Sequence, residues 1–90
     1  MIRIKDDYVI LVDDNEYTAA IDKHKKDKRG YDLYKDLGYY STLKSAIKGI
    51  YAYMLRHGLS EKEYDLSEAI EYVEKVTKEL NDKIDKAVIF

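Results

Sequence analysis

The residues whose side chains could do chemistry are two histidines, several serines, and clustered acids and lysines. Nucleophilic catalysis needs a base within hydrogen-bond reach of the nucleophile and a third group that orients the base. His24 lies in a basic segment, and His57 lies in a predicted last helical turn, where an imidazolium complements the helix dipole. Nothing in the spacing links either histidine to a serine. The sequence therefore predicts a protein that is not an enzyme.

Metal and cofactor binding are not predicted either. The chain has no cysteine, so a thiolate zinc site is excluded. The stretch 13–16 offers carboxylate oxygens, but it lacks the spaced acids, the glycine and the terminal glutamate of a calcium loop. We expect no cofactor and no metal.

A cluster of cations stands between two predicted strands and consists of Lys23, Lys25, Lys26, Lys28 and Arg29. This segment, predicted as a loop over residues 23–29, could bind phosphates or an acidic protein. A solvated loop without a ligand explains the same residues, so both interpretations stay open.

A second candidate site combines aromatic and cationic residues around the start of the first predicted helix. Its members are Tyr39, Tyr40, Lys44, Lys48 and Arg56. Free amides at a helix N-terminus, nearby lysines and aromatic faces could hold a nucleotide phosphate and stack its base. The alternative is that both tyrosines only pack, one in the core and one over the helix entry.

Composition narrows the possible functions. Charged residues make up 38% of the 90 residues, yet the formal net charge is only −2, whereas general nucleic-acid binders are usually basic overall. The sequence shows no signal-peptide pattern and no apolar run near the roughly 20 residues that span a bilayer. We expect a cytoplasmic protein with no membrane partner, for which nucleic acid is a less favoured partner than a protein or a small nucleotide.

These residues must be positioned by a single small α+β domain over residues 1–90. Alternating apolar and polar residues predict a small antiparallel sheet of three or four strands over about residues 2–37. Acidic and amide side chains predict tight turns at residues 6–7 and 13–15. The sheet is followed by two packed helices.

The first helix is predicted over about residues 42–57, with Thr42 or Ser41 as its N-cap and Gly58 as its stop. It carries more apolar surface than one buried stripe requires. Gly49 costs a helix on the order of 1 kcal/mol relative to alanine, so close packing there would explain it. We therefore expect a homo-oligomer, with an interface formed by Gly49, Tyr51, Ala52, Leu55, Ile89 and Phe90.

The second helix is predicted over about residues 66–87, with Asp65 and Glu68 as a capping pair. Four acid-to-lysine pairs at four-residue spacing should each stabilise it by roughly a few tenths of a kcal/mol. We interpret its heptad stripe as the face that packs: Leu66, Ile70, Val73, Thr77, Leu80, Ile84 and Ala87.

Two stretches of the sequence, residues 34–56 and 65–80, each contain a helix start whose residue pattern is also found in a group of other small proteins. The matching positions are Tyr39, Tyr40, Ser41, Leu43, Ala46, Ile47 and Lys48, then Leu66, Ser67, Ala69 and Ile70. In these runs the chain resembles small phage and prophage accessory proteins, in which a strand meander leads into two helices.

The resemblance implies a non-enzymatic phage-type accessory protein that acts by binding. Such a protein would counter host defence, either by inhibiting a bacterial immune protein or by sequestering a nucleotide immune signal. Two alternatives remain: a nucleic-acid-binding phage regulator that uses the basic loop, and a structural or assembly subunit without a ligand.

Overall fold

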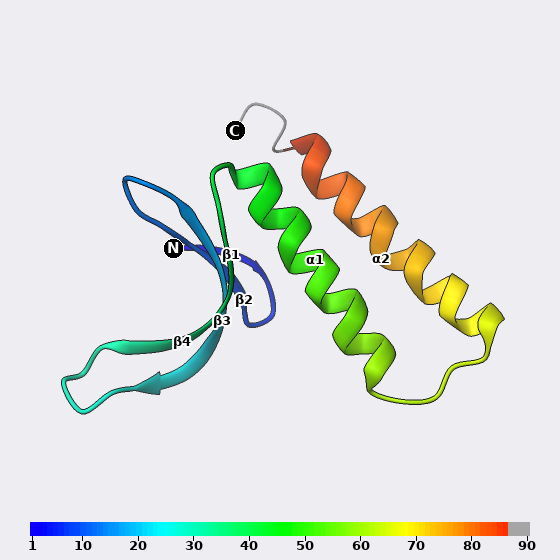
Figure 1. The fold of residues 1–90 in the computed structure, drawn as a ribbon, viewed down its shortest axis with the longest axis horizontal. Helices are drawn as coiled ribbons and strands as arrows, with labels where there is room; N and C mark the ends of the chain where they lie inside the picture. Colours follow the sequence, from blue (N-terminus) through cyan, green and yellow to red (C-terminus); the bar gives the residue numbers. More distant parts are fainter. Residues whose placement is uncertain (87–90) are drawn as a thin grey trace.

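The computed structural model describes residues 1–86 and has the predicted α+β architecture. Its elements follow in the order β1 (Ile2–Lys5), β2 (Tyr8–Val12), β3 (Tyr17–Lys26), β4 (Asp32–Tyr40), α1 (Leu43–Ser60) and α2 (Leu66–Lys86). Figure 1 shows the sheet beside an antiparallel pair of helices. The predicted end of the second helix at residue 87 lies outside the described residues.

The four strands form one antiparallel sheet in the order β1-β2-β3-β4, so each strand pairs with its neighbours in sequence. Both predicted turns are confirmed. The Oδ1 atom of Asp13 accepts hydrogen bonds from the backbone amides of Asn15 and Glu16 at 2.7 and 2.8 Å. In the β1–β2 turn, Asp6 adopts the left-handed region with φ 50°, which aspartate tolerates better than most residues.

The strand β3 extends into the predicted loop, and β4 continues past the predicted end of the sheet near residue 37. The two strands form an arm that extends from the rest of the sheet (Figure 1). The predicted loop over residues 23–29 is wrong in its first half, because β3 continues to Lys26. The reversal is short because Asp27 Oδ1 accepts hydrogen bonds from the backbone amides of Arg29 and Tyr31 at 2.8 and 3.1 Å. Gly30, with φ 86°, completes the turn.

Helix α1 begins as predicted but ends later. Thr42 is the N-cap, and its Oγ1 accepts a hydrogen bond from the backbone amide of Ser45 at 3.1 Å. The prediction that Gly58 stops the helix is wrong, because α1 continues to Ser60. The Tyr72 ring of α2 occupies the place where a Cβ of residue 58 would lie. This glycine therefore allows a close contact between helices.

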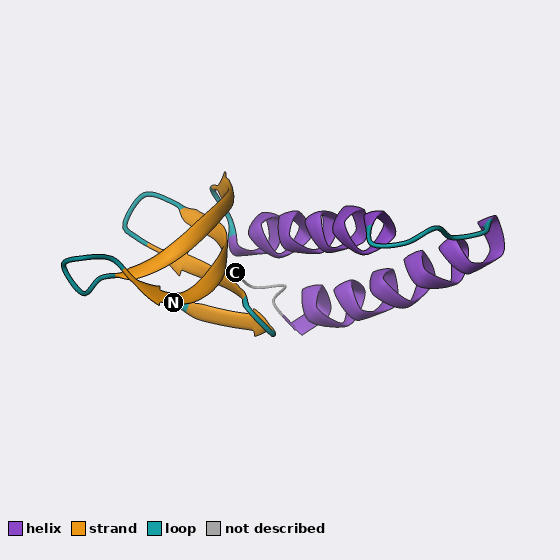
Figure 2. Cartoon of the chain, turned by 90° about the horizontal axis from the view of Figure 1, so that it is seen from below, coloured by secondary structure: helices purple, strands orange, loops and turns teal. Residues whose placement is uncertain are grey.

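The core lies between α1 and one face of the sheet, and α2 closes it. Its buried members are Ile10, Ala19, Ala46, Ile47, Ile50, Tyr51 and Val76. Tyr51 is the largest fully buried side chain, and its hydroxyl donates a hydrogen bond to Glu79 at 3.1 Å. Figure 2 shows both helices on one side of the curved sheet.

Helix α2 begins as predicted, with Asp65 Oδ1 accepting a hydrogen bond from the Glu68 amide at 2.8 Å. Its heptad stripe packs only in part. Leu80 and Ile84 pack against the core, whereas Leu66, Ile70 and Val73 are 77%, 49% and 37% exposed. The interpretation of the stripe as a packing face is wrong for these residues and for the exposed Thr77, because α2 packs through a neighbouring face that contains Tyr72 and the buried Val76. The first turn of α2 also extends beyond the end of α1 (Figure 2).

The four predicted ion pairs within α2 do not form. In none of them does the lysine nitrogen lie within 4 Å of a carboxylate oxygen. Glu79 instead binds Lys5 of β1 at 3.0 Å. Most charges of α2 therefore face solvent without a partner among residues 1–86.

We expect Gly58→Ala to destabilise the protein, although alanine favours a helix by on the order of 1 kcal/mol. The added Cβ must displace the Tyr72 ring. In a Tyr72→Ala background the same substitution should stabilise the protein, because the space is then open. Urea unfolding of the four proteins should give a coupling free energy on the order of 1 kcal/mol, and equal effects in both backgrounds would contradict the contact.

Candidate functional site

The two tyrosines of the predicted nucleotide site lie on opposite faces of β4. Both residues pair with β3, so the strand continues to Tyr40 rather than ending near residue 37. Neighbouring strand residues point to opposite faces. The half-buried Tyr40 ring packs over Gly49 of α1, and the 61% exposed Tyr39 donates its hydroxyl to Asp36 at 2.8 Å. The structure therefore does not place the two rings on one stacking surface.

The cations predicted for the same site lie on α1. Lys44, Lys48 and Arg56 are exposed, and none forms a salt bridge among residues 1–86. The Thr42 hydroxyl already accepts a hydrogen bond from one of the backbone amides at the start of the helix, that of Ser45. What remains at this site is a row of solvated positive charges.

The predicted basic loop is an ordered feature, which we call the basic arm (residues 23–31). Lys26 pairs with Asp32 across the two strands at 2.8 Å. The Arg29 guanidinium lies over the Tyr31 ring, 5.4 Å from its centroid, and 3.7 Å from Asp27. The three remaining lysines have no ion pair within the described chain: Lys23, Lys25 and Lys28.

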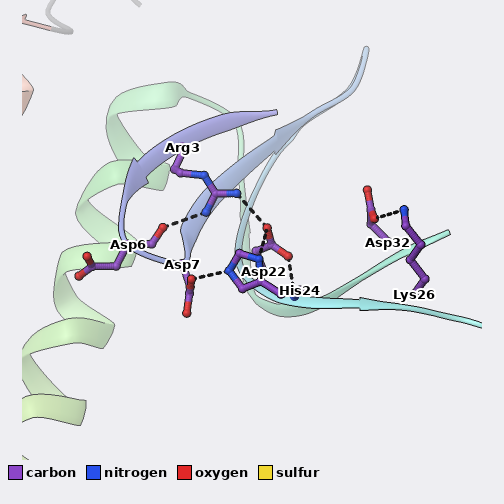
Figure 3. Close-up of polar contacts among 7 residues, drawn as sticks. All are labelled: Arg3, Asp6, Asp7, Asp22, His24, Lys26 and Asp32. Atoms are coloured by element: carbon purple, nitrogen blue, oxygen red, sulfur yellow. Dashed lines mark hydrogen bonds and ion pairs between the residues drawn. The ribbon is translucent and has the colours of Figure 1, made fainter.

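An ionic cluster at the base of the arm was missed by the sequence analysis (Figure 3). Arg3 of β1 donates to Asp22 of β3 at 2.9 Å and to the Asp6 carbonyl at 2.8 Å. His24 Nε2 lies 2.6 Å from Asp7 Oδ1, and its Nδ1 lies 3.6 Å from Asp22. His24 has φ 53° where the β3–β4 register shifts. No periodicity signals such a left-handed residue, so the approach of these groups was not foreseeable.

The cluster favours the charged forms of its members. The hydrogen bond that His24 donates to Asp7, together with the charge of Asp22, raises the pKa of His24 above its ordinary value of 6.5. The hydrogen bonds from Arg3 and from the His24 amide lower the pKa of Asp22. Both ring nitrogens of His24 lie beside carboxylates, which favour the protonated imidazolium over the neutral ring.

A small cleft of about 240 Å³ lies between the β1–β2 turn, α1 and α2. Lys5 and Glu79 pair at its wall, and Lys75, Tyr8 and Tyr72 also line it. The Lys5 hydrogen bond lowers the pKa of Glu79, and burial raises the pKa of Tyr51 behind it. The Tyr72 hydroxyl donates to the Met54 carbonyl at 3.4 Å, so three of these side chains already have partners within the chain.

The residues predicted for an interface between copies are used largely within one chain. Tyr51 has no exposed surface to offer a second copy. Leu55 packs against the core and Ala52 is half-buried. Close packing at Gly49 is confirmed, but the group that approaches is Tyr40 of the same chain. Ile89 and Phe90 lie outside the described residues.

An exposed apolar surface is found elsewhere, at the start of α2. Leu66, Ile70 and Val73 are three and four residues apart, so they form one face of the helix. We call these three residues the α2 surface. The sequence analysis identified the stripe but assigned it to the core.

Two negative findings apply to residues 1–86. They contain no group of three or more histidine, cysteine or acidic residues arranged to hold a metal ion. Neither α1 nor α2 is long and apolar enough to cross a membrane.

Comparison with protein families, curated proteins and solved structures finds no match to this chain.

We expect NMR titration to place the pKa of His24 above 6.5. Because the folded pKa is raised, the ion pair contributes stability that is fully present below about pH 6.5 and is lost as pH rises through the folded pKa. Asp7→Asn should return the titration toward 6.5. His24→Asn keeps a residue that tolerates positive φ and should remove this pH dependence of unfolding. An unchanged titration in Asp7→Asn would contradict the assignment.

Proposed function

We propose that this chain is a non-catalytic, phage-type accessory protein that binds a partner protein and occludes it. The supporting observation is the α2 surface, where Leu66, Ile70 and Val73 are 77%, 49% and 37% exposed. Contiguous exposed apolar residues rimmed by polar ones are typical of protein–protein contacts. In a cytoplasmic setting, the partner would be a bacterial immune protein that this binding inhibits.

The chemistry of the partner follows from the charges around the α2 surface. Residues 61–74 contain six acidic residues and one lysine. Interfaces combine an apolar centre with a rim of complementary charge. The expected partner surface is therefore apolar at its centre and basic at its edge.

Sequestration of a nucleotide signal is a less supported form of the proposal. Lys44 and Lys48 could attract phosphates to the start of α1. A base could stack only on Tyr39, because the Tyr40 ring covers Gly49.

Nucleic-acid binding by the basic arm is a second candidate function. Residues 23–31 contain five lysine and arginine residues and one aspartate, and they form the end of β3 and the turn of the β3–β4 hairpin. A two-stranded ribbon fits the major groove of DNA. The exposed Tyr31, with Arg29 over its ring, adds a stacking surface.

We expect Ile70→Glu to weaken partner binding by roughly 30-fold or more, as loss of an interface hot spot does. The measurement is affinity capture from bacterial lysate, followed by titration of the purified pair. Asn81→Glu is the matched control, because it adds the same charge to an exposed site of α2, three turns away. A partner bound equally by both variants would place its contact elsewhere and remove the proposed role of the α2 surface.

For the second candidate, we expect binding to DNA or RNA to weaken steeply with added salt. Reversing Lys23, Lys25 and Lys28 to glutamate should abolish it, whereas Lys26 is left unchanged because it holds Asp32. Lys44→Glu with Lys48→Glu serves as the control on α1. A mobility shift that survives the arm reversal would exclude the arm as the nucleic-acid site.

A further inference from the structure

The molecule is electrically polarised along its length. The tip of the basic arm and the start of α2 lie at opposite ends of the molecule, whose longest dimension is 47 Å (Figure 1). The arm carries five cationic residues against one aspartate, and residues 61–74 carry six acids against one lysine. One copy therefore presents two complementary ends that cannot reach each other within the same chain.

The charges at both ends are available for intermolecular contacts. Lys23, Lys25 and Lys28 form no ion pair among residues 1–86, and the same holds for Glu63, Glu68, Glu71 and Glu74. Each end also presents apolar or aromatic surface. Tyr31 is 66% exposed on the arm, and the α2 surface is exposed at the other end. The Tyr31 ring is flanked by cations, and the α2 surface is flanked by carboxylates, so the two surfaces are complementary in polarity and in charge.

We infer that the basic arm of one copy docks on the α2 surface of a second copy, so that the protein associates head to tail. This inference goes beyond the proposed function, because it names a second copy of the chain as a further occupant of the α2 surface. Because the two contacting surfaces differ, the contact is heterologous. Repetition of such a contact produces a ring if the rotation closes and a filament if it does not.

A two-fold contact between α2 surfaces is disfavoured by the same charges. Pairing the first turns of two α2 helices around Ile70 would bring Glu68, Glu71 and Glu74 of each copy beside those of the other. Like charges in close contact oppose association. The arm supplies the opposite sign, and this difference selects head-to-tail association over a symmetric dimer.

The test uses two neutralised variants of the full chain. The arm variant carries Lys23→Gln, Lys25→Gln and Lys28→Gln. The end variant carries Glu63→Gln, Glu71→Gln and Glu74→Gln, and it keeps Asp65 and Glu68, which form the start of α2. Neutralisation is preferred to reversal, because a reversed arm could bind a reversed end.

Sedimentation equilibrium of the purified wild-type protein should give a mass above twice the 10.6 kDa of one chain at low salt. The mass should fall toward that of one chain at about 0.5 M salt, where charges are screened within a few ångströms. Each variant alone should remain monomeric. An equimolar mixture should form a dimer and grow no further, since only one arm and one end are intact per pair. Dimer formation also shows that both variants are folded.

A wild-type protein that stays monomeric at low salt up to millimolar concentration would overturn the inference. So would arm and end variants that each self-associate as the wild type does, because the contact would then lie on other surfaces. Neither result affects the capture experiment with Ile70→Glu, which reports on a different partner. A lysate partner captured equally by Ile70→Glu and Asn81→Glu, with self-association of the wild type intact, would instead remove the proposed function and leave this inference standing.

Discussion

The buried Tyr51 side chain is the contact on which the arrangement of the three parts of this fold depends. Its ring fills the core from α1, and its hydroxyl reaches Glu79 of α2 at 3.1 Å. The same carboxylate binds Lys5 of β1 at 3.0 Å. One side chain therefore joins the middle helix to the last helix and, through Glu79, to the first strand. A buried hydroxyl without this partner would be costly, so this bond favours the observed register of α2 on α1.

The positions of α1 and α2 determine which surfaces remain open. Packing of Tyr72 over Gly58 aligns α2 with the end of α1, and the helix then continues past that end. Its first turns carry Leu66 and Ile70 into solvent. At the other side of the molecule, the short turn around Asp27 lets β3 and β4 continue as an arm. The two exposed regions therefore result from element lengths that exceed what the core requires.

Local sequence patterns predicted the fold class, the turns near Asp6 and Asp13, and the caps at Thr42 and Asp65, because each depends on residues close in the chain. Contacts between distant segments were not predictable in this way. A glycine at position 58 has the same local pattern whether it stops a helix or receives a tyrosine ring. The heptad stripe of α2 was identified, but the helix packs through a neighbouring face with Tyr72 and Val76, and contacts with distant segments decide which face is covered. The His24 network requires a left-handed residue that no pattern indicates.

The overhang of α2 has a further consequence for how the chain moves. Its first turns, around Leu66 and Ile70, lack a helix packed on their apolar side, and short helical segments in water are only marginally stable. Local fraying there need not disturb the rest of the domain. A molecule that binds these turns would have to order them, and part of its binding free energy would be spent on suppressing that fraying. Association at this end would therefore be accompanied by a local coil-to-helix transition.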